Sequence, residues 1–166
     1  MKANPLVLLM MGSDTDLPVM QEAADILRAF NIQYEMRISS AHRSPVRTLT
    51  LASEAAGRGI KVIIAGAGMA AHLAGVVASK TILPVIGVPM PGGALNGVDA
   101  LYATVQMPAG IPVATMAIGK AGAKNAGLFA IQILALSEPH LSDSLQQYRI
   151  DMDKELEQKD AALQNR

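Results

Sequence analysis

The chain has no cysteine and no tryptophan, and its 166 residues include only three tyrosines and two phenylalanines. Without cysteine it can form no disulfide and offer no thiolate, and the composition does not indicate a redox compartment. Three scattered histidines do not favour a metal cage, so we expect no metal site. With 51% hydrophobic but only 3% aromatic residues, the core must be packed by Ala, Val, Ile, Leu and Met. That much apolar surface on a small chain favours a homo-oligomer.

The chain also lacks net charge, because 14 Lys and Arg balance 14 Asp and Glu. Neither nucleic acid nor an acidic membrane surface is therefore attracted by a general field, and an anionic ligand must be bound locally. Residues 60–90 are rich in apolar side chains, but glycine, histidine, lysine and proline interrupt them, so they do not form a membrane span. The apolar run 6–11 superficially resembles a signal peptide without a cleavage site, and we interpret it as the first strand of a cytoplasmic protein.

Short strand-like runs alternate with helical patterns, which is typical of βαβ units and a parallel sheet. We expect strands at 6–11, 34–38, 62–65, 85–88 and 113–118. We expect helices at about 17–30, 45–56, 70–79, 96–106 and 123–137, the first of them capped by Thr15 or Asp16. Right-handed crossovers then favour an α/β three-layer sandwich, whose five-stranded parallel sheet has the flavodoxin-like order 2-1-3-4-5.

The C-terminal segment 139–166 follows the last expected strand and differs from the rest of the chain. Its apolar residues form a narrow stripe on an otherwise charged helix: Leu141, Leu145, Tyr148, Met152 and Leu156. We expect residues 1–166 to form a single catalytic domain. Within it, 139–166 is an extra C-terminal helix and tail that packs on a neighbouring subunit and frays from Gln158 onward.

The turns after the first two expected strands carry side chains suited to chemistry. In open parallel sheets, ligands bind at the carboxyl ends of the strands, where the strand order reverses. The turn 12–16 brings Ser13 and Asp16, which can hydrogen-bond a sugar or phosphate but are equally typical of helix capping. The turn 39–45 places His42 beside Arg43 at an expected helix N-terminus, where a proton carrier and an anion-binding fork suit a phosphorylated substrate. A solvated turn with a chance His-Arg pair is the alternative.

The third turn, 65–72, reads AGAGMAAH and formally matches the dinucleotide pattern G-x-G-x-x-A. The acidic residue expected about 20 positions further on is missing, so we do not favour a dinucleotide site. The small residues still let a ligand approach main-chain N–H groups. Near Gly119, the lysine is followed by Ala121, which argues against a P-loop.

For the remaining polar candidates, structural interpretations are favoured. His72 would lie in the first turn of the third helix, where a structural role is favoured over catalysis. His140 follows Pro139 between helices and is expected to be solvated. Loop and capping roles are favoured for three residues after the fifth strand, although their position would let them touch a neighbour's site: Lys120, Lys124 and Asn125.

The three turns belong to a longer series of motifs that runs in one order from about residue 6 to residue 150. The segments are MGSDTD at 11–16, SAHRSP at 40–45, VIIAGAG at 62–68, AAHL at 70–73, LNGVD at 95–99, VQMP at 105–108 and GKAGAKNA at 119–126. This series resembles the family of N5-carboxyaminoimidazole ribonucleotide mutases, also called the catalytic subunit of phosphoribosylaminoimidazole carboxylase. Two positions depart from the family pattern, which usually has glycine in place of Met69 and proline in place of Ala74.

The resemblance implies an isomerisation in purine biosynthesis, with no metal or organic cofactor. The carboxylate on the exocyclic nitrogen would leave as CO2 and be captured by ring carbon C4, which then loses its proton. His42 is suited to shuttle that proton near neutral pH. The resemblance assigns substrate binding to Ser13, Asp16, Ser40, Arg43, Gly68, Ala70 and Leu73, with Ser40 joining Arg43 at the phosphate.

The family has a second reaction class, because its animal-type members carboxylate aminoimidazole ribonucleotide directly with CO2. Those members resemble a pattern with lysine after the histidine, so Arg43 favours the mutase. The resemblance also implies an octamer whose sites draw on several subunits, and a separate ATP-using synthetase that makes the unstable substrate. Two alternatives remain open: a carboxylase for another nucleotide, and a flavodoxin-like or nucleotide-sensing module. Against a flavin partner, no tyrosine lies in the three turns.

Overall fold

The computed structural model describes residues 4–165, which divide into two compact units, one up to Ile131 and one from Gln132 onward. The strands are β1 (Val7–Met11), β2 (Tyr34–Ile38), β3 (Val62–Ala67), β4 (Val85–Pro89) and β5 (Ala114–Thr115). The helices are α1 (Leu17–Ala29), α2 (Pro45–Glu54), α3 (Leu73–Ala78), α4 (Val98–Val105), α5 (Lys120–Ala135) and α6 (Pro139–Gln164). Two short 3₁₀ helices, Asp14–Asp16 and Ala56–Arg58, precede α1 and follow α2.

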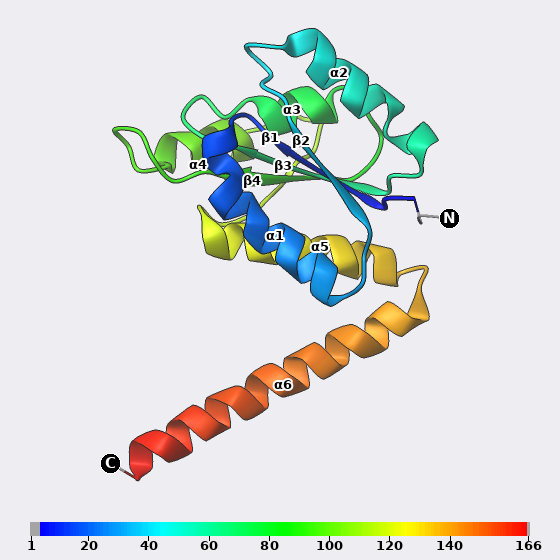
Figure 1. Ribbon diagram of the computed structural model, residues 1–166. Coiled ribbons are helices and arrows are strands. Elements are labelled where there is room, and N and C mark those ends of the chain that lie inside the picture. Colours follow the sequence, from blue (N-terminus) through cyan, green and yellow to red (C-terminus); the bar gives the residue numbers. More distant parts are fainter. Residues whose placement is uncertain (1–3, 166) are drawn as a thin grey trace. The chain divides into compact units, whose positions relative to one another are not determined.

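The five strands form one parallel sheet in the order β2-β1-β3-β4-β5, which confirms the predicted order (Figure 1). All residues of β1 and β4 and the first five of β3 are buried, as continuous apolar runs covered on both faces should be. From β1 the chain passes to β2 on one side and then crosses to β3 on the other side of β1, so the order in which strands are added reverses between β1 and β3. The carboxyl ends of these two strands flank the point where ligands bind in such folds.

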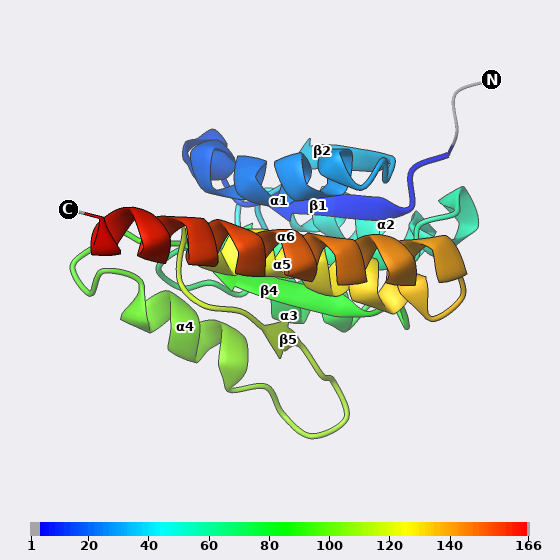
Figure 2. The same cartoon turned by 90° about the horizontal axis from the view of Figure 1, so that it is seen from below.

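Helices cover both faces of the sheet, which gives the three predicted layers (Figure 1). On one face, α1 and the first part of α5 lie side by side (Figure 2). A Cβ built on Gly127 of α5 would lie 3.0 Å from the carbonyl oxygen of Ala23 in α1, so the missing side chain allows this close approach.

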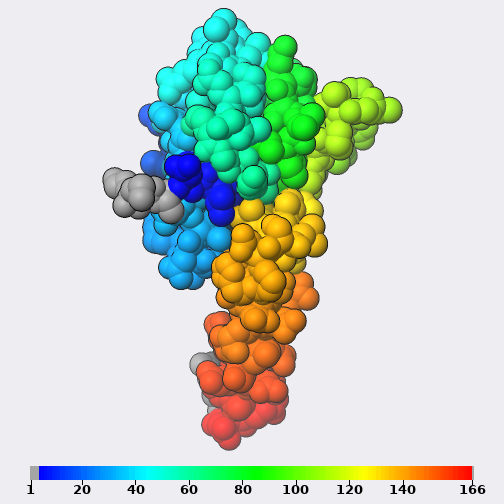
Figure 3. Space-filling model, turned by 90° about the vertical axis from the view of Figure 1, so that its right-hand side faces the viewer, coloured from blue at the N-terminus to red at the C-terminus, as the bar shows by residue number. Residues whose placement is uncertain are grey.

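The opposite face carries α2, α3 and α4. Strand residues that alternate toward this face, such as Leu8 and Ile63, pack with buried residues of α2 and α3, such as Ala52 and Val77. Figure 3 shows the first unit from the side, where α2 in cyan adjoins the green segment that contains α3. α4 reaches the same layer because Gly87 of β4 leaves room for the methyl group of Thr104.

Several predicted boundaries need correction. The fifth strand is limited to Ala114–Thr115, although the Met116 N–H still donates to the Gly87 carbonyl oxygen. The chain then turns sharply into α5, where a side chain on Gly122 would overlap the backbone of Ala117. Asp16 occupies the N-cap position of α1 as expected, but its side chain makes no capping bond there; the capping bonds belong to the preceding 3₁₀ helix, whose N-cap residue is Ser13.

The second unit contains the end of α5 and the long helix α6. Helix α6 continues to Gln164, so the expected fraying from Gln158 onward is wrong. Charged pairs one turn apart stabilise its exposed surface; the Nζ of Lys159, for example, bonds the Oε1 of Glu155 at 2.5 Å. Within residues 4–165, no helix is both long and apolar enough to span a membrane.

Candidate functional site

The turn after β1 is built as a helix cap. The Ser13 N–H donates to Oδ2 of Asp16 at 3.1 Å, and the Thr15 N–H donates to Oγ of Ser13 at 3.3 Å. This capping box satisfies backbone donors that would otherwise be free at the helix end. The capping interpretation of Ser13 and Asp16 is therefore confirmed, but it leaves other oxygen lone pairs of both side chains available to a ligand.

The turn after β2 is tied to the turn after β1 by Arg43. Its Nη2 donates to the carbonyl oxygen of Gly12 at 3.0 Å, and its backbone N–H donates to Oγ of Ser40 at 3.2 Å. Ser44 occupies the N-cap position of α2, but its side chain makes no capping bond there. The guanidinium is exposed, so most of its donors remain available to an anion.

The turn after β3 meets the turn after β2 through two histidines. The Nε2 of His42 lies 2.8 Å from the Nδ1 of His72, and the two rings stand edge to face with centroids 4.9 Å apart. His72 is the N-cap residue of α3, where its side chain makes no capping bond. Its contact is instead with the other histidine, a partnership that spacing along the chain does not indicate.

These three turns surround one pocket of about 460 Å³. All eight residues singled out for chemistry or substrate binding line it: Ser13, Asp16, Ser40, His42, Arg43, Gly68, Ala70 and Leu73. The polar members come from the turns after β1 and β2, whereas the small and apolar members come from the turn after β3. The pocket thus has a polar end, which contains the arginine, and an end lined by backbone and small apolar groups.

Two parts of the site were not predicted from the sequence. The loop after β4 supplies a fourth wall, made by Met90, Pro91, Gly92 and Gly93. A proline followed by two glycines at the carboxyl end of a central parallel strand is a signal that could have found it. Arg43 also borders a second hollow of about 440 Å³, which Arg47 lines from the first turn of α2.

Asp16 is the pocket residue with a perturbed ionisation. Burial raises the pKa of its carboxyl group above the usual value, and this effect exceeds the opposing effect of the backbone N–H groups of Ser13 and Gly12. A carboxyl group of this kind favours a ligand that donates hydrogen bonds, such as a hydroxyl group.

Other polar candidates lie elsewhere. His140 is exposed in the second unit, where its Nδ1 lies 3.7 Å from Glu138. Lys120 pairs with Glu22 of α1 at 3.3 Å, and neither it nor Lys124 nor Asn125 lines the pocket. Within residues 4–165, no three His, Cys, Asp or Glu side chains are grouped so that they could hold a metal ion.

The two departures from the family pattern lie in different surroundings. Ala74 is buried in α3, next to Gly87 of the sheet, and does not line the pocket. Met69 lines the pocket, is 63% exposed, and has a left-handed backbone with φ of 54°. Of the two, only Met69 changes the wall of the site.

A parallel α/β sheet with a histidine pair and an arginine at its switch point defines a small-molecule enzyme site of the flavodoxin-like class. The family model described as AIR carboxylase matches residues 6–155, and the chain belongs to this family. It is 55% identical over 161 residues to the N5-carboxyaminoimidazole ribonucleotide mutase of Pyrococcus horikoshii, covering 97% of this chain and 90% of that protein.

Further comparisons agree with this assignment. The mutase of the same name from Bacillus subtilis is 55% identical over 146 residues, which cover 88% of this chain and 90% of that protein. The crystal structure of Treponema denticola PurE superimposes with a TM-score of 0.86 at 30% identity, covering 96% and 98% of the two chains. The phosphoribosylaminoimidazole carboxylase of Schizosaccharomyces pombe is 52% identical over 149 residues, which are 90% of this chain but 27% of that protein.

Proposed function

We propose that this chain is an isomerase of de novo purine biosynthesis that converts N5-carboxyaminoimidazole ribonucleotide to 4-carboxy-5-aminoimidazole ribonucleotide. The observation that carries the proposal is the hydrogen-bonded pair of His42 and His72 beside Arg43 in one pocket, in a chain 55% identical to a mutase of that name. Family membership argues against the alternative of a module that only binds nucleotides or flavin.

The charged end of the pocket is suited to the phosphate of the substrate. Arg43 offers a planar fork of donors, Ser40 adds a hydroxyl group, and the N-terminus of α2 adds a partial positive charge. Next to the phosphate, Ser13 and Asp16 are suited to the ribose, because the carboxyl group of Asp16 can accept hydrogen bonds from sugar hydroxyl groups.

The opposite end of the pocket is suited to the imidazole ring and its carboxylate. Gly68 has no side chain and Ala70 has only a methyl group, so the ring can approach the backbone of this turn closely. Leu73 provides an apolar surface. Backbone N–H groups of the same turn could stabilise the negative charge on the migrating group.

His42 is the proposed proton shuttle. In the reaction, the bond between the exocyclic nitrogen and the carboxyl carbon breaks, and the nitrogen gains a proton as CO2 is released. C4 then attacks the CO2 carbon and loses its own proton. One group that first donates a proton to the nitrogen and then accepts one from C4 accounts for both proton transfers. An imidazole performs both steps near neutral pH.

The contact with His72 determines which ring nitrogen of His42 is left for the substrate. Because Nε2 of His42 is engaged by His72, the ring nitrogen left for the substrate is Nδ1. When the His42 ring is neutral and the shared hydrogen lies on its Nε2, Nδ1 is a base. When Nδ1 has taken up a proton, both nitrogens of His42 carry hydrogens, the ring is an acid, and Nδ1 of His72 accepts the hydrogen bond from Nε2. We therefore assign His72 as a positioning residue, which replaces the structural role favoured from the sequence.

The reaction as proposed uses no metal or organic cofactor. Retaining CO2 in the pocket makes its recapture effectively intramolecular, and proximity of this kind can be worth about 7–11 kcal/mol of the barrier. Two alternatives concern the substrate: direct carboxylation of aminoimidazole ribonucleotide, and CO2 transfer to another nucleotide. The carboxylase name of the fungal relative keeps the first alternative relevant.

We also propose that the chain, 1–166, is a single catalytic domain that assembles as a homo-oligomer, an octamer by family resemblance. Two exposed apolar stripes support assembly: Val98, Tyr102 and Val105 on α4, and Met152 and Leu156 on α6. On this view, α6 packs on a neighbouring subunit. A chain truncated after Ser137 should then give a smaller mass in light scattering, and an unchanged mass would contradict the role of α6.

The cellular setting follows from the chemistry of the substrate. An N-carboxylated amine loses CO2 readily, so the enzyme would depend on a separate ATP-using synthetase that makes the substrate continuously. A cytoplasmic location is part of the proposal. The apolar N-terminal run, expected to be the first strand, forms β1, an inner strand of the sheet.

The experiment that tests the function compares two substrates. Purified protein is incubated with freshly made N5-carboxyaminoimidazole ribonucleotide, and separately with aminoimidazole ribonucleotide at high bicarbonate. Product carboxylated at C4 is followed by ultraviolet absorbance. Fast conversion of the first and slow conversion of the second are expected. Efficient use of the second would indicate a carboxylase, and no product from either would overturn the proposal.

A further inference from the structure

Met69 has a backbone conformation that its side chain does not favour. Its φ of 54° lies in the left-handed region, where a bulky residue such as methionine is disfavoured by contact between its Cβ and the following carbonyl group. Strain of this kind persists only where the surroundings impose it, and it gathers at functional sites. The question is what the methionine side chain contributes at this position.

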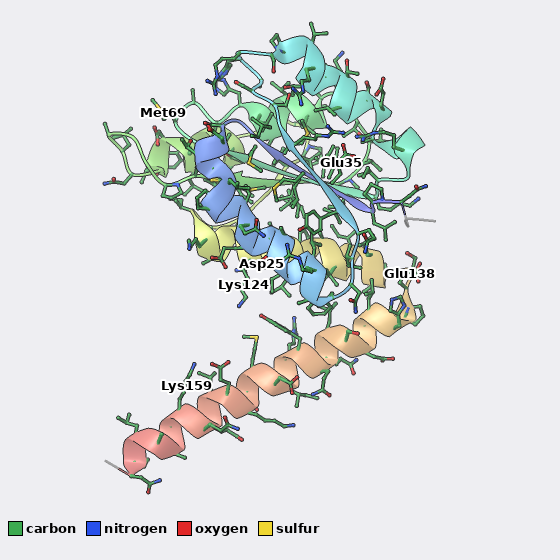
Figure 4. The ribbon with its side chains drawn as sticks, viewed as in Figure 1. Asp25, Glu35, Met69, Lys124, Glu138 and Lys159 are labelled. Atoms are coloured by element: carbon green, nitrogen blue, oxygen red, sulfur yellow. The ribbon has the colours of Figure 1, made fainter. Side chains whose placement is uncertain are left out.

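Burial does not provide an answer, because the side chain of Met69 is 63% exposed. It is instead placed at the mouth of the pocket, between the turn after β3 and the loop after β4. A Cβ built on Gly93 would lie 3.3 Å from Cγ of Met69, so the methionine side chain lies against the backbone of that loop. Figure 4 shows Met69 at the edge of the first unit, where α1 begins.

The loop that faces Met69 presents two glycines to the pocket. Gly92 and Gly93 have φ of 131° and 67°, conformations that glycine adopts without strain. Methionine has three rotatable bonds and a polarisable thioether, so it can adapt to a ligand of irregular shape. Together, the unbranched apolar side chain of Met69 and the two glycines line adjoining parts of the pocket wall.

We propose that Met69 closes the mouth of the pocket over the bound ribonucleotide and retains the CO2 released during the reaction. This inference rests on the proposed function and adds a residue that determines the fate of the intermediate. Once the bond between nitrogen and the carboxyl carbon has broken, CO2 either is attacked by C4 or escapes and leaves aminoimidazole ribonucleotide. CO2 carries no charge and no hydrogen-bond donor, so an apolar cover retains it better than the open, polar mouth that a glycine would leave.

The test measures how often the intermediate is lost. The full-length protein and the variants Met69→Gly, Met69→Gln and Met69→Leu are given the N5-carboxylated substrate. Released aminoimidazole ribonucleotide is then measured per molecule of C4-carboxylated product, after subtraction of the enzyme-free decomposition rate. We expect Met69→Gly to raise this ratio at least fivefold and Met69→Gln, which is similar in shape but polar, to raise it less. Met69→Leu should stay within twofold of the parent protein.

The thermal midpoint separates this role from a structural one. Glycine relieves the left-handed strain, so Met69→Gly should unfold at the same or a higher temperature than the parent protein while losing more CO2. Ile82, which is fully exposed and does not line the pocket, supplies the matched control, and Ile82→Gly should leave the ratio unchanged.

The outcomes distinguish the two proposals. If the parent protein turns over and Met69→Gly releases no more aminoimidazole ribonucleotide than it does, the role of Met69 is wrong. An equal increase for Ile82→Gly would also overturn it. If the parent protein forms no C4-carboxylated product, the proposed function itself has failed.

Discussion

The Nε2 of His42 lies 2.8 Å from the Nδ1 of His72, although 30 residues separate them in the chain. The contact exists because the turns after β2 and β3 meet at the carboxyl edge of the sheet, on either side of β1. It defines which nitrogen of His42 is left for the substrate, and so links strand order directly to the proposed proton transfer.

Replacing His42 should separate chemistry from binding. In His42→Asn the pocket keeps its arginine and its small residues but loses its proton carrier. We expect kcat to fall by about 100- to 10,000-fold. Affinity for the ribonucleotide, measured by calorimetry, should stay within about tenfold, equivalent to about 1.4 kcal/mol. Loss of binding together with turnover would instead indicate that His42 has a structural role.

Replacing His72 should affect turnover more than binding or stability. His72→Ala removes the partner that orients His42, and misplacement of a reacting group can cost as much as about 100-fold in kcat. His72→Asn keeps a hydrogen-bonding group near the position of Nδ1 and should recover part of this loss. Because His72 is exposed, both variants should melt close to the parent protein. Equal kcat in all three proteins would rule out a positioning role.

Arg43→Ala should mainly weaken substrate binding. Hydrogen bonds to charged groups are worth about 1.5–3 kcal/mol each, so losing the arginine should raise KM by roughly 10- to 100-fold. Arg43→Lys keeps the charge but not the fork and should lie between the two. Steady-state kinetics of the three proteins test this order, and Ile82→Ala on the exposed surface serves as control. An unchanged KM in Arg43→Ala would remove this residue from the phosphate site.

Glu35 of β2 gives the fold a pH dependence that is separate from catalysis. Burial acts to raise the pKa of its carboxyl group, but ion pairs with Arg37 and Arg58 outweigh it, so the pKa lies below the usual 4.5 (Figure 4). Its contribution to stability is therefore present above the unfolded-state pKa and is lost as the pH falls through the lowered folded-state value.

The variant Glu35→Gln should thus be less stable at pH 7 by about 1–2 kcal/mol, measured by denaturant unfolding. The difference from the parent protein should shrink as the pH falls below about 4.5 and vanish below the folded-state pKa. Glu157→Gln, on the exposed surface of α6, should show no such trend. A difference for Glu35→Gln that is constant with pH would contradict the assigned ion pairs.

Periodicity was enough to predict the sheet, because buried parallel strands are continuous apolar runs and right-handed crossovers leave few orders for them. It also predicted that the three turns meet at one edge. All eight predicted site residues line the same pocket, but Ser40, Gly68, Ala70 and Leu73 were assigned from the family resemblance and not from periodicity. Boundaries were less predictable where a tertiary contact decides them, as at the short β5, where α5 folds back against Ala117. The same reason hid the contact between His42 and His72, which does not follow from local spacing. The wall formed by Pro91 to Gly93 could have been found, because its proline and glycines closely follow a strand.

The most direct measurement of the central claim follows the carboxylate itself. The N5-carboxylated ribonucleotide is labelled with ¹³C in its carboxyl group and converted in buffer that contains unlabelled bicarbonate. Mass spectrometry of the product then reports whether the same carbon has moved. The account predicts that most of the product retains the label, because CO2 is recaptured inside the pocket. A product that carries mainly unlabelled carbon would contradict it.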